Sequence, residues 1–173
     1  MAEEKVLTKK EQFALVKEKE PVAEVALNYN EEILKVRRVS TKRSGGSNFH
    51  YSVLAVVGDN NGNVGIALAK SKENSNAIRK AKDKAKRSMI KIPLTKDKSI
   101  PHEIFIRNGA SILFLKPAPL GAGIIAGSSI RRIMELAGIR NVSAKIIGTN
   151  NQISNAYTLM DAFRELNAGF KGE

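Results

Sequence analysis

The chain has 173 residues and a net charge of +12, with 42% apolar and 27% charged residues. This length suits one ordinary domain or two small ones that share a core. The chain has no cysteine, which excludes disulfides, thiolate catalysis and cysteine-based zinc sites. No stretch approaches the roughly 18 apolar residues needed to cross a bilayer, so we expect no membrane partner.

The positive charge is concentrated in one part of the chain. Residues 1–32 carry eight acids against five basic residues, residues 33–91 carry three against 14, and residues 92–173 carry six against ten. Such a cluster attracts polyanions, whereas a surface that only keeps the protein soluble does not require clustering. An anionic membrane is a weaker alternative, because the most basic predicted helix has mainly Ala on its apolar side. We therefore favour nucleic acid as the partner.

The N-terminal segment, residues 1–27, mixes both charges with few large apolar side chains. We expect a tail, or a segment that becomes ordered on a partner. Pro21 argues against one continuous helix there. The segment has no secretory signal pattern and is too acidic for a typical organelle transit peptide. We expect a second, short tail at residues 169–173.

Residues 28–94 are predicted to form a first domain of three strands followed by a long basic helix. Strands are expected near residues 31–41, 48–59 and 64–71, because the second alternates apolar side chains and the third is an apolar run of strand length. The pair Asn61-Gly62 predicts a tight antiparallel hairpin between the last two strands, since glycine supplies the positive φ of such a turn.

The helix of this domain is expected to begin near residue 74. Its first residues offer N-cap oxygens, and Pro93 is expected to end it. The apolar stripe recurs at spacings of three and four residues, through Ile78, Ala81, Ala85, Met89 and Ile92. Basic residues occupy the rest of the surface, namely Arg79, Lys80, Lys82, Lys84, Lys86 and Arg87.

Residues 95–168 are predicted to form a small α/β domain, with the boundary near Thr95, so that the chain as a whole is α+β. The expected order is strand, strand, helix, strand, helix, at residues 102–109, 110–118, 128–138, 141–149 and 151–167. A Gly-rich turn, residues 119–127, precedes the first helix. Gly138 is expected to close that helix.

The segment that most favours RNA is an acid-free run of cations before two glycines. Its residues are Lys35, Arg37, Arg38, Lys42, Arg43, Ser44, Gly45 and Gly46. Two adjacent glycines let a backbone adopt unusual φ values and approach a ligand closely. Because predicted strands flank the loop, we expect a long hairpin arm that projects cations between phosphates or into a groove. A solvated hairpin with incidental charge is the alternative.

Two further features of the first domain bear on RNA binding. The basic helix could contact phosphates across a groove, as helices of double-stranded-RNA-binding folds do, and we expect its cations to share an electropositive face with the arm. Phe49 and Tyr51 could stack on unpaired bases, but they alternate on one face with Val53 and Val57. Core packing is therefore the favoured role of both aromatic side chains.

The Gly-rich turn formally matches the dinucleotide fingerprint G-x-G-x-x-A through Gly121, Gly123 and Ala126. Pro117 and Pro119 separate the preceding strand from the turn, however, and the next strand ends without an acid to hold a ribose hydroxyl. We favour a turn that packs closely or meets another protein. Acids and histidines show no useful pairing, so we expect no catalytic residue, cofactor or metal.

Two runs of the sequence resemble the bacterial-type small-subunit ribosomal protein S-five family. They are GGSNFHYSVLAVVGDNNGNVGIALAKSKENSNAIRKAKDKAKRSMI and PAPLGAGIIAGSSIRRIMELAGIRNVSAKIIGTNN. The resemblance covers about residues 28–166. It implies a double-stranded-RNA-binding-like first domain, a second α/β domain, and a cytoplasmic, rRNA-bound constituent of the small subunit near the mRNA entrance and neck. The implied neighbours are small-subunit proteins four and eight.

The resemblance also implies roles for individual residues. The loop over residues 40–46 would reach rRNA beside the spectinomycin pocket, while Gly121, Gly123 and Arg131 would face protein four at an interface linked to decoding accuracy. The chain departs from the family pattern at Ser47, Asn60, Ala122, Ser128, Gln152 and Ser154.

We therefore expect a structural RNA-binding protein without catalytic activity. The residues expected to bind rRNA are Lys35, Arg37, Arg38, Lys42, Arg43, Ser44, Gly45, Gly46, Arg79, Lys80, Lys84 and Arg87. A free-standing double-stranded-RNA-binding regulator is the first alternative, and a small nucleotide-dependent enzyme that uses the Gly-rich turn is the second.

Overall fold

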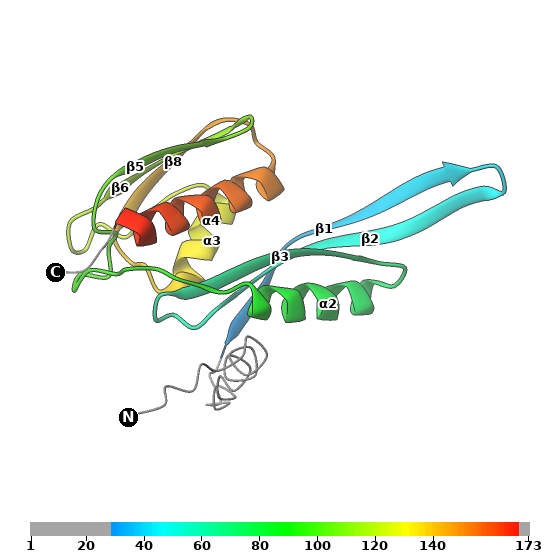
Figure 1. Ribbon diagram of the computed structural model, residues 1–173, viewed down its shortest axis with the longest axis horizontal. Coiled ribbons are helices and arrows are strands. Elements are labelled where there is room, and N and C mark those ends of the chain that lie inside the picture. Colours follow the sequence, from blue (N-terminus) through cyan, green and yellow to red (C-terminus); the bar gives the residue numbers. More distant parts are fainter. Residues whose placement is uncertain (1–28, 170–173) are drawn as a thin grey trace, which may run out of the picture.

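The computed structural model describes residues 29–169, which form two four-stranded sheets and three helices (Figure 1). The predicted α+β class is confirmed. The tails expected at residues 1–27 and 169–173 lie outside the described residues, apart from residue 169. Within residues 29–169, no helix is long and apolar enough to cross a bilayer.

The first sheet has the strand order β1-β2-β3-β4, and all neighbouring strands are antiparallel. Its strands are β1 (Asn30–Arg43), β2 (Gly46–Gly58), β3 (Asn63–Ser71) and β4 (Ile90–Lys91). The three predicted strands are present. Pairing of β2 with β3 is as expected, but a four-residue loop joins them, with positive φ at Asn60 and Gly62 rather than at Asn61 and Gly62.

Helix α2 (Asn74–Arg87) lies across one face of this sheet. Three small buried residues, Ala77, Ala81 and Ala85, form its contact face. At Gly65 of β3, an added Cβ would lie 2.2 Å from the carbonyl oxygen of Ala85. Small residues on both sides therefore allow the helix to pack unusually close to the strand.

Both ends of α2 differ from the sequence-based expectation. Glu73 is the N-cap residue and makes no capping hydrogen bond, while Asn74 lies inside the first turn. The helix ends at Arg87 and not at Pro93, because Ile90 pairs with β3 and the N–H of Ile92 donates to Gly62. The apolar residues near 90 therefore reach the core from a short strand, at a spacing that mimics a helix.

The second sheet has the order β5-β6-β8-β7. Its elements in chain order are β5 (Ile104–Asn108), β6 (Ser111–Pro117), β7 (Ile124–Ile125), α3 (Ser128–Ala137), β8 (Val142–Gly148) and α4 (Gln152–Gly169). The expected order of strands and helices is present, with one addition. The two-residue strand β7 lies within the predicted turn and pairs parallel with β8.

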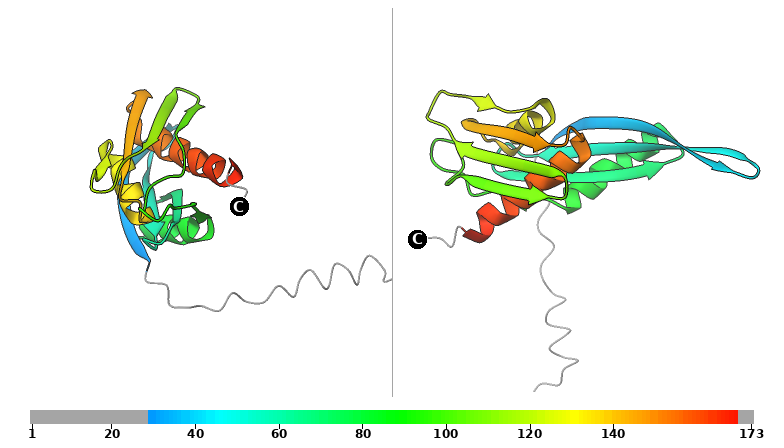
Figure 2. Two further views of the ribbon diagram at one scale, coloured as in Figure 1. Left: turned by 90° about the vertical axis from the view of Figure 1, so that its left-hand side faces the viewer. Right: turned by 90° about the horizontal axis from the view of Figure 1, so that it is seen from above.

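Helices α3 and α4 lie between the two sheets (Figures 1 and 2). One hydrophobic cluster joins Leu54 and Val64 of the first sheet to Leu113 of the second, with Ile130 of α3 and Phe163 of α4 between them. All five side chains are almost completely buried. The two halves of the chain therefore share a core, as the length of the chain allowed.

Backbone groups also connect the halves. In the loop between β2 and β3, the N–H of Asn60 donates to the carbonyl of Leu136 at 3.0 Å, and that of Gly62 donates to Ala137 at 2.9 Å. These carbonyls belong to the last turn of α3, where a helix leaves acceptors without internal partners. Gly138 follows with a φ of 82°. The loop of the first half thus completes the C-terminus of a helix in the second.

Candidate nucleic-acid interface

Strands β1 and β2 continue past the end of β3 as a two-stranded arm, defined here as residues 39–50. Pairing with β3 ends at Tyr51 and Ser71, whereas β1 and β2 stay paired from Val39 and His50 to Arg43 and Gly46. Five residue pairs give the arm a length of about 16 Å. Figure 1 shows it extending away from the body of the protein. The predicted hairpin arm is present.

The tip of the arm is a two-residue turn, Ser44-Gly45. Of the two glycines at the tip, Gly46 has a positive φ of 129° and Gly45 does not. A Cβ added at either position would meet nothing within 4 Å. The need for special backbone geometry is therefore confined to Gly46, and open space surrounds both glycines.

The cations of the arm and its base point to both faces of the ribbon. Arg38 lies opposite Tyr51, on the face that α2 covers, and Lys42 shares that face because side chains alternate along a strand. Arg37 and Arg43 lie on the opposite face. We expected Lys42, Arg43 and the cations of α2 to share one face. This prediction is confirmed for Lys42 and is wrong for Arg43, because consecutive residues of a strand point to opposite faces.

Lys35 occupies a different environment from the other cations of β1. It is half-buried, beside a bulge in the register between Ile33 and Lys35, and lies opposite Leu54. Residues 36–43, in contrast, are all exposed. Lys35 is thus a cation of the sheet body, whereas Lys42 and Arg43 belong to the arm.

Phe49 and Tyr51 have different roles. Tyr51 is half-buried and packs against the core between β2 and α2, as expected. Phe49 is 44% exposed, so its predicted core packing is wrong. The guanidinium of Arg38 lies over its ring, 4.0 Å from the centroid, in a cation–π arrangement. The two planar groups form an exposed stack at the base of the arm.

One side of α2, called here the paired flank, is partly neutralised by β1. The carboxylate of Glu31 lies 2.8 Å from the ammonium of Lys82 and 2.7 Å from that of Lys86. Hydrogen bonds from these two ammonium groups lower the pKa of Glu31 below its ordinary value of 4.5. Arg79 lies three residues before Lys82 and so projects near this side.

The other side of α2, the open flank, carries Lys80, Lys84 and Arg87 at spacings of four and three residues. All three are exposed, and none forms an ion pair with a carboxylate of residues 29–169. The sequence alone presented six similar cations on this helix. The fold separates Lys82 and Lys86, which share the carboxylate of Glu31, from the other four, which have no such partner among residues 29–169.

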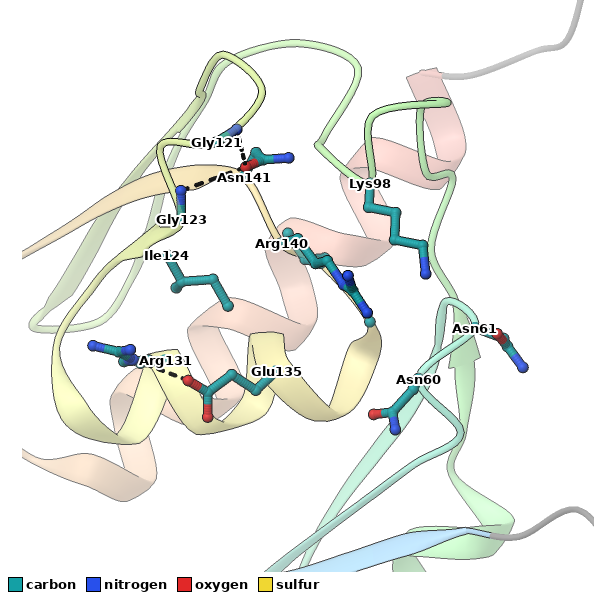
Figure 3. A pocket seen from close by; sticks show the side chains of 12 residues that line it. Asn60, Asn61, Lys98, Gly121, Gly123, Ile124, Arg131, Glu135, Arg140 and Asn141 are labelled. Atoms are coloured by element: carbon teal, nitrogen blue, oxygen red, sulfur yellow. Dashed lines mark hydrogen bonds and ion pairs between the residues drawn. The ribbon is translucent and has the colours of Figure 1, made fainter.

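The residues predicted to contact protein lie together in the second half. Gly121, Gly123 and Arg131 line one hollow of about 620 Å³ (Figure 3). The N–H groups of both glycines donate to Oδ1 of Asn141, at 3.1 and 3.4 Å, and Nδ2 of Asn141 donates to the backbone carbonyl of Asp97 at 2.7 Å. Asn141 therefore holds the Gly-rich turn. No sequence motif identified it, because its partners lie 18–44 residues away.

The Gly-rich turn does not have the geometry of a dinucleotide site. In that fingerprint the glycines lead directly from a strand into a helix. Here β7 follows Gly123, and α3 begins only at Ser128. The large apolar side chains of Leu120 and Ile125, which flank the glycines, are 76% and 60% exposed. Among residues 29–169, no group of three or more His, Asp or Glu could hold a metal ion.

Comparison with known proteins identifies the family. Residues 29–93 match the family description "Ribosomal protein S5, N-terminal domain", and residues 106–168 match "Ribosomal protein S5, C-terminal domain". A small ribosomal subunit protein uS5 of Thermotoga maritima is 41% identical over 138 residues, which cover 80% of this chain and 77% of the relative. The uS5c protein of Rhodomonas salina is 36% identical over 139 residues, covering 80% and 83%.

Both halves of the chain are thus matched, in order. Members of this family are structural, non-enzymatic and RNA-binding, and in bacteria they belong to the cytoplasmic ribosome. The alternative of a nucleotide-dependent enzyme is therefore excluded. The chain belongs to the ribosomal protein S5 family and is a structural protein of the small ribosomal subunit.

Proposed function

We propose that this chain binds small-subunit rRNA through the arm and the open flank of α2, near the mRNA entrance and the neck of the subunit. The observation that carries the proposal is the exposed arm, whose cations have no carboxylate partner among residues 29–169. Binding neutralises phosphates and releases their counterions, a gain that falls as salt rises. The proposed residues are Lys35, Arg37, Arg38, Lys42, Arg43, Ser44, Gly45, Gly46, Arg79, Lys80, Lys84 and Arg87.

The two-sided arm suits insertion between RNA segments. A surface that lies along one groove needs its cations on one face, whereas Lys42 and Arg43 project to opposite faces at the tip. A thin ribbon with cations on both faces can contact phosphates on either side at once. The open tip at Gly45 and Gly46 allows close approach of a ribose–phosphate chain.

The body of the first half provides the second contact. Three strands with a helix across one face, and cations on that helix, support the comparison with double-stranded-RNA-binding folds. We propose that Lys80, Lys84 and Arg87 contact phosphates, while Glu31 keeps Lys82 and Lys86 from doing so.

The second half is proposed to contact protein, with the division near Thr95. Small-subunit proteins four and eight are the proposed neighbours, and protein four would contact the hollow beside Gly121, Gly123 and Arg131. Exposed Leu120 and Ile125 support this role, because large apolar side chains at a surface favour protein contact. Through these contacts the chain would support subunit assembly and translational accuracy.

The arm is tested with the variant Lys42→Ala/Arg43→Ala, compared with Lys82→Ala/Lys86→Ala, which removes the same charge from the paired flank. Lysates of cells that express either variant are separated on sucrose gradients after a moderate salt wash. We expect the arm variant to leave the small subunit at lower salt than the parent, or to disturb assembly or the response to spectinomycin. The control should stay close to the parent.

The isolated fold of the arm variant should be intact, since exposed side chains typically contribute within about 0.5 kcal/mol to stability. Far-UV circular dichroism and urea unfolding check this point. The proposed role of the arm is rejected if the arm variant assembles into the small subunit and resists the salt wash as well as the control variant does. A parent protein that is found only at the top of the gradient would instead favour the free-standing regulator.

A further inference from the structure

A notch lies where β3 leaves the first sheet and the paired strands β1 and β2 continue into the arm. The hollow there has a volume of about 470 Å³ and is lined by His50, Lys70, Ser71, Lys72, Glu73, Asn76 and Lys80. They come from β2, from the end of β3, from the connection to α2 and from α2 itself. None of the first four was expected from the sequence to contact RNA. The notch thus adds a cationic group between the arm and the helix.

The notch has an excess of positive charge. Lys70, Lys72 and Lys80 contribute three ammonium groups, and none of them pairs with a carboxylate among residues 29–169. Glu73 is the only acid that lines the hollow, and its carboxylate accepts a hydrogen bond from the side chain of Asn76. Three cations around one hollow repel one another, and an anion that enters the hollow offsets this repulsion.

The position of the notch points to the source of the anion. His50 lies opposite Val39, and Lys70 lies opposite Ser52, so both side chains start from the face of the sheet away from α2, at the edge where β3 ends. Lys80 belongs to the open flank of α2. Because Lys80 lines the same hollow as His50 and Lys70, an anion in the notch would contact the base of the arm and the helix together, between the two proposed RNA contacts.

We propose that the notch binds a single phosphodiester group of the RNA backbone. This inference rests on the proposed function and adds a site to it. Lysine ammonium groups act as point charges toward phosphate, and a neutral or protonated imidazole N–H donates to a phosphate oxygen. The site would thereby hold one phosphate between the base of the arm and α2. Free phosphate has the same chemistry, so the experiment includes it.

The first measurement is the salt dependence of binding between the full chain and an in vitro transcript of small-subunit rRNA. The variants are Lys70→Ala/Lys72→Ala and the charge-matched control Lys82→Ala/Lys86→Ala. Because Lys70→Ala/Lys72→Ala should lose one phosphate contact, the plot of log K against log salt should become less steep by about 0.9. The gain in affinity between 1 M and 0.1 M salt then shrinks about eightfold. The control should retain the parental slope.

The second measurement uses the two histidines of the chain in proton NMR. The ring protons of His50 should shift when a short duplex RNA is added, while those of His102, in the loop before β5, should not. Inorganic phosphate at the same phosphate concentration should leave His50 unchanged. The Lys70→Ala/Lys72→Ala variant, checked for its fold by urea unfolding, should lose the shift.

The outcomes separate this inference from the proposed function. A parent that shows no salt-dependent binding to the rRNA would overturn both. A parent that binds, with equal slopes for both double variants and no selective shift of His50, would overturn the notch alone. An equal response of His50 to inorganic phosphate would assign the notch to a free anion and reject the RNA backbone.

Discussion

Gly138 allows the loop between β2 and β3 to meet the end of α3, and Gly138→Ala should weaken this contact between the two halves. Its φ is 82°, in the left-handed region, and a Cβ added to it would lie 2.1 Å from the backbone oxygen of Asn60. A backbone oxygen cannot rotate away as a side-chain end can. The loop between β2 and β3 would therefore have to move by about 1.3 Å to restore an ordinary contact distance of 3.4 Å.

The cost of Gly138→Ala has two parts. Placing Ala in the left-handed region costs about 1–2 kcal/mol. Moving the loop also breaks the hydrogen bonds from the N–H groups of Asn60 and Gly62 to the end of α3, which contribute about 1 kcal/mol each. We expect a loss of about 3–4 kcal/mol in the free energy of unfolding. For a chain of this size that corresponds to a decrease of about 6–16 °C in Tm.

Gly109→Ala is the matched control. Gly109 also has a positive φ, 61°, but a Cβ there would meet nothing within 4 Å. This variant should lose only the conformational part, about 1–2 kcal/mol. Urea unfolding followed by far-UV circular dichroism measures both. If Gly138→Ala is destabilised no more than Gly109→Ala, the close contact between Gly138 and Asn60 does not hold the two halves together, and the reasoning is refuted.

Two further predictions concern the paired flank and the shared core. Because Lys82 and Lys86 lower the pKa of Glu31 below 4.5, the stability that Glu31 adds is present above pH 4.5 and is lost as the pH falls through the lower folded value. Urea unfolding of Glu31→Gln and the parent should therefore differ at pH 7 and converge in acid; a difference independent of pH contradicts this. Phe163→Ala should cost about 3–5 kcal/mol and raise amide hydrogen exchange in both sheets, whereas a change in the second sheet alone would argue against a shared core.

Short-range patterns in the sequence determined much of the fold. Alternation of apolar side chains along β2 identified a strand, and the Asn-Gly pair at residues 61–62 identified a hairpin connection, because both signals depend only on neighbouring residues. The acid-free run before Gly45 indicated a projecting arm for the same reason. Two long matches to family patterns gave the family.

Other features needed the tertiary structure. The end of α2 was misplaced because residues 90–92 have apolar spacing compatible with a helix, and pairing with β3 decides otherwise. Phe49 shares the strand pattern of Tyr51, yet no helix covers it, so only the extent of α2 over the sheet separates an exposed ring from a core ring.

The available charge is the clearest case of this division. From the sequence alone, Lys80 and Lys82 are equivalent cations on one helix. The structure brings the carboxylate of Glu31, which lies 51 residues earlier in the chain than Lys82, to Lys82 and not to Lys80. Composition and spacing thus determined that a concentrated positive charge exists, while the folded chain decides which cations remain free, because a carboxylate neutralises only the groups within a few ångströms of it.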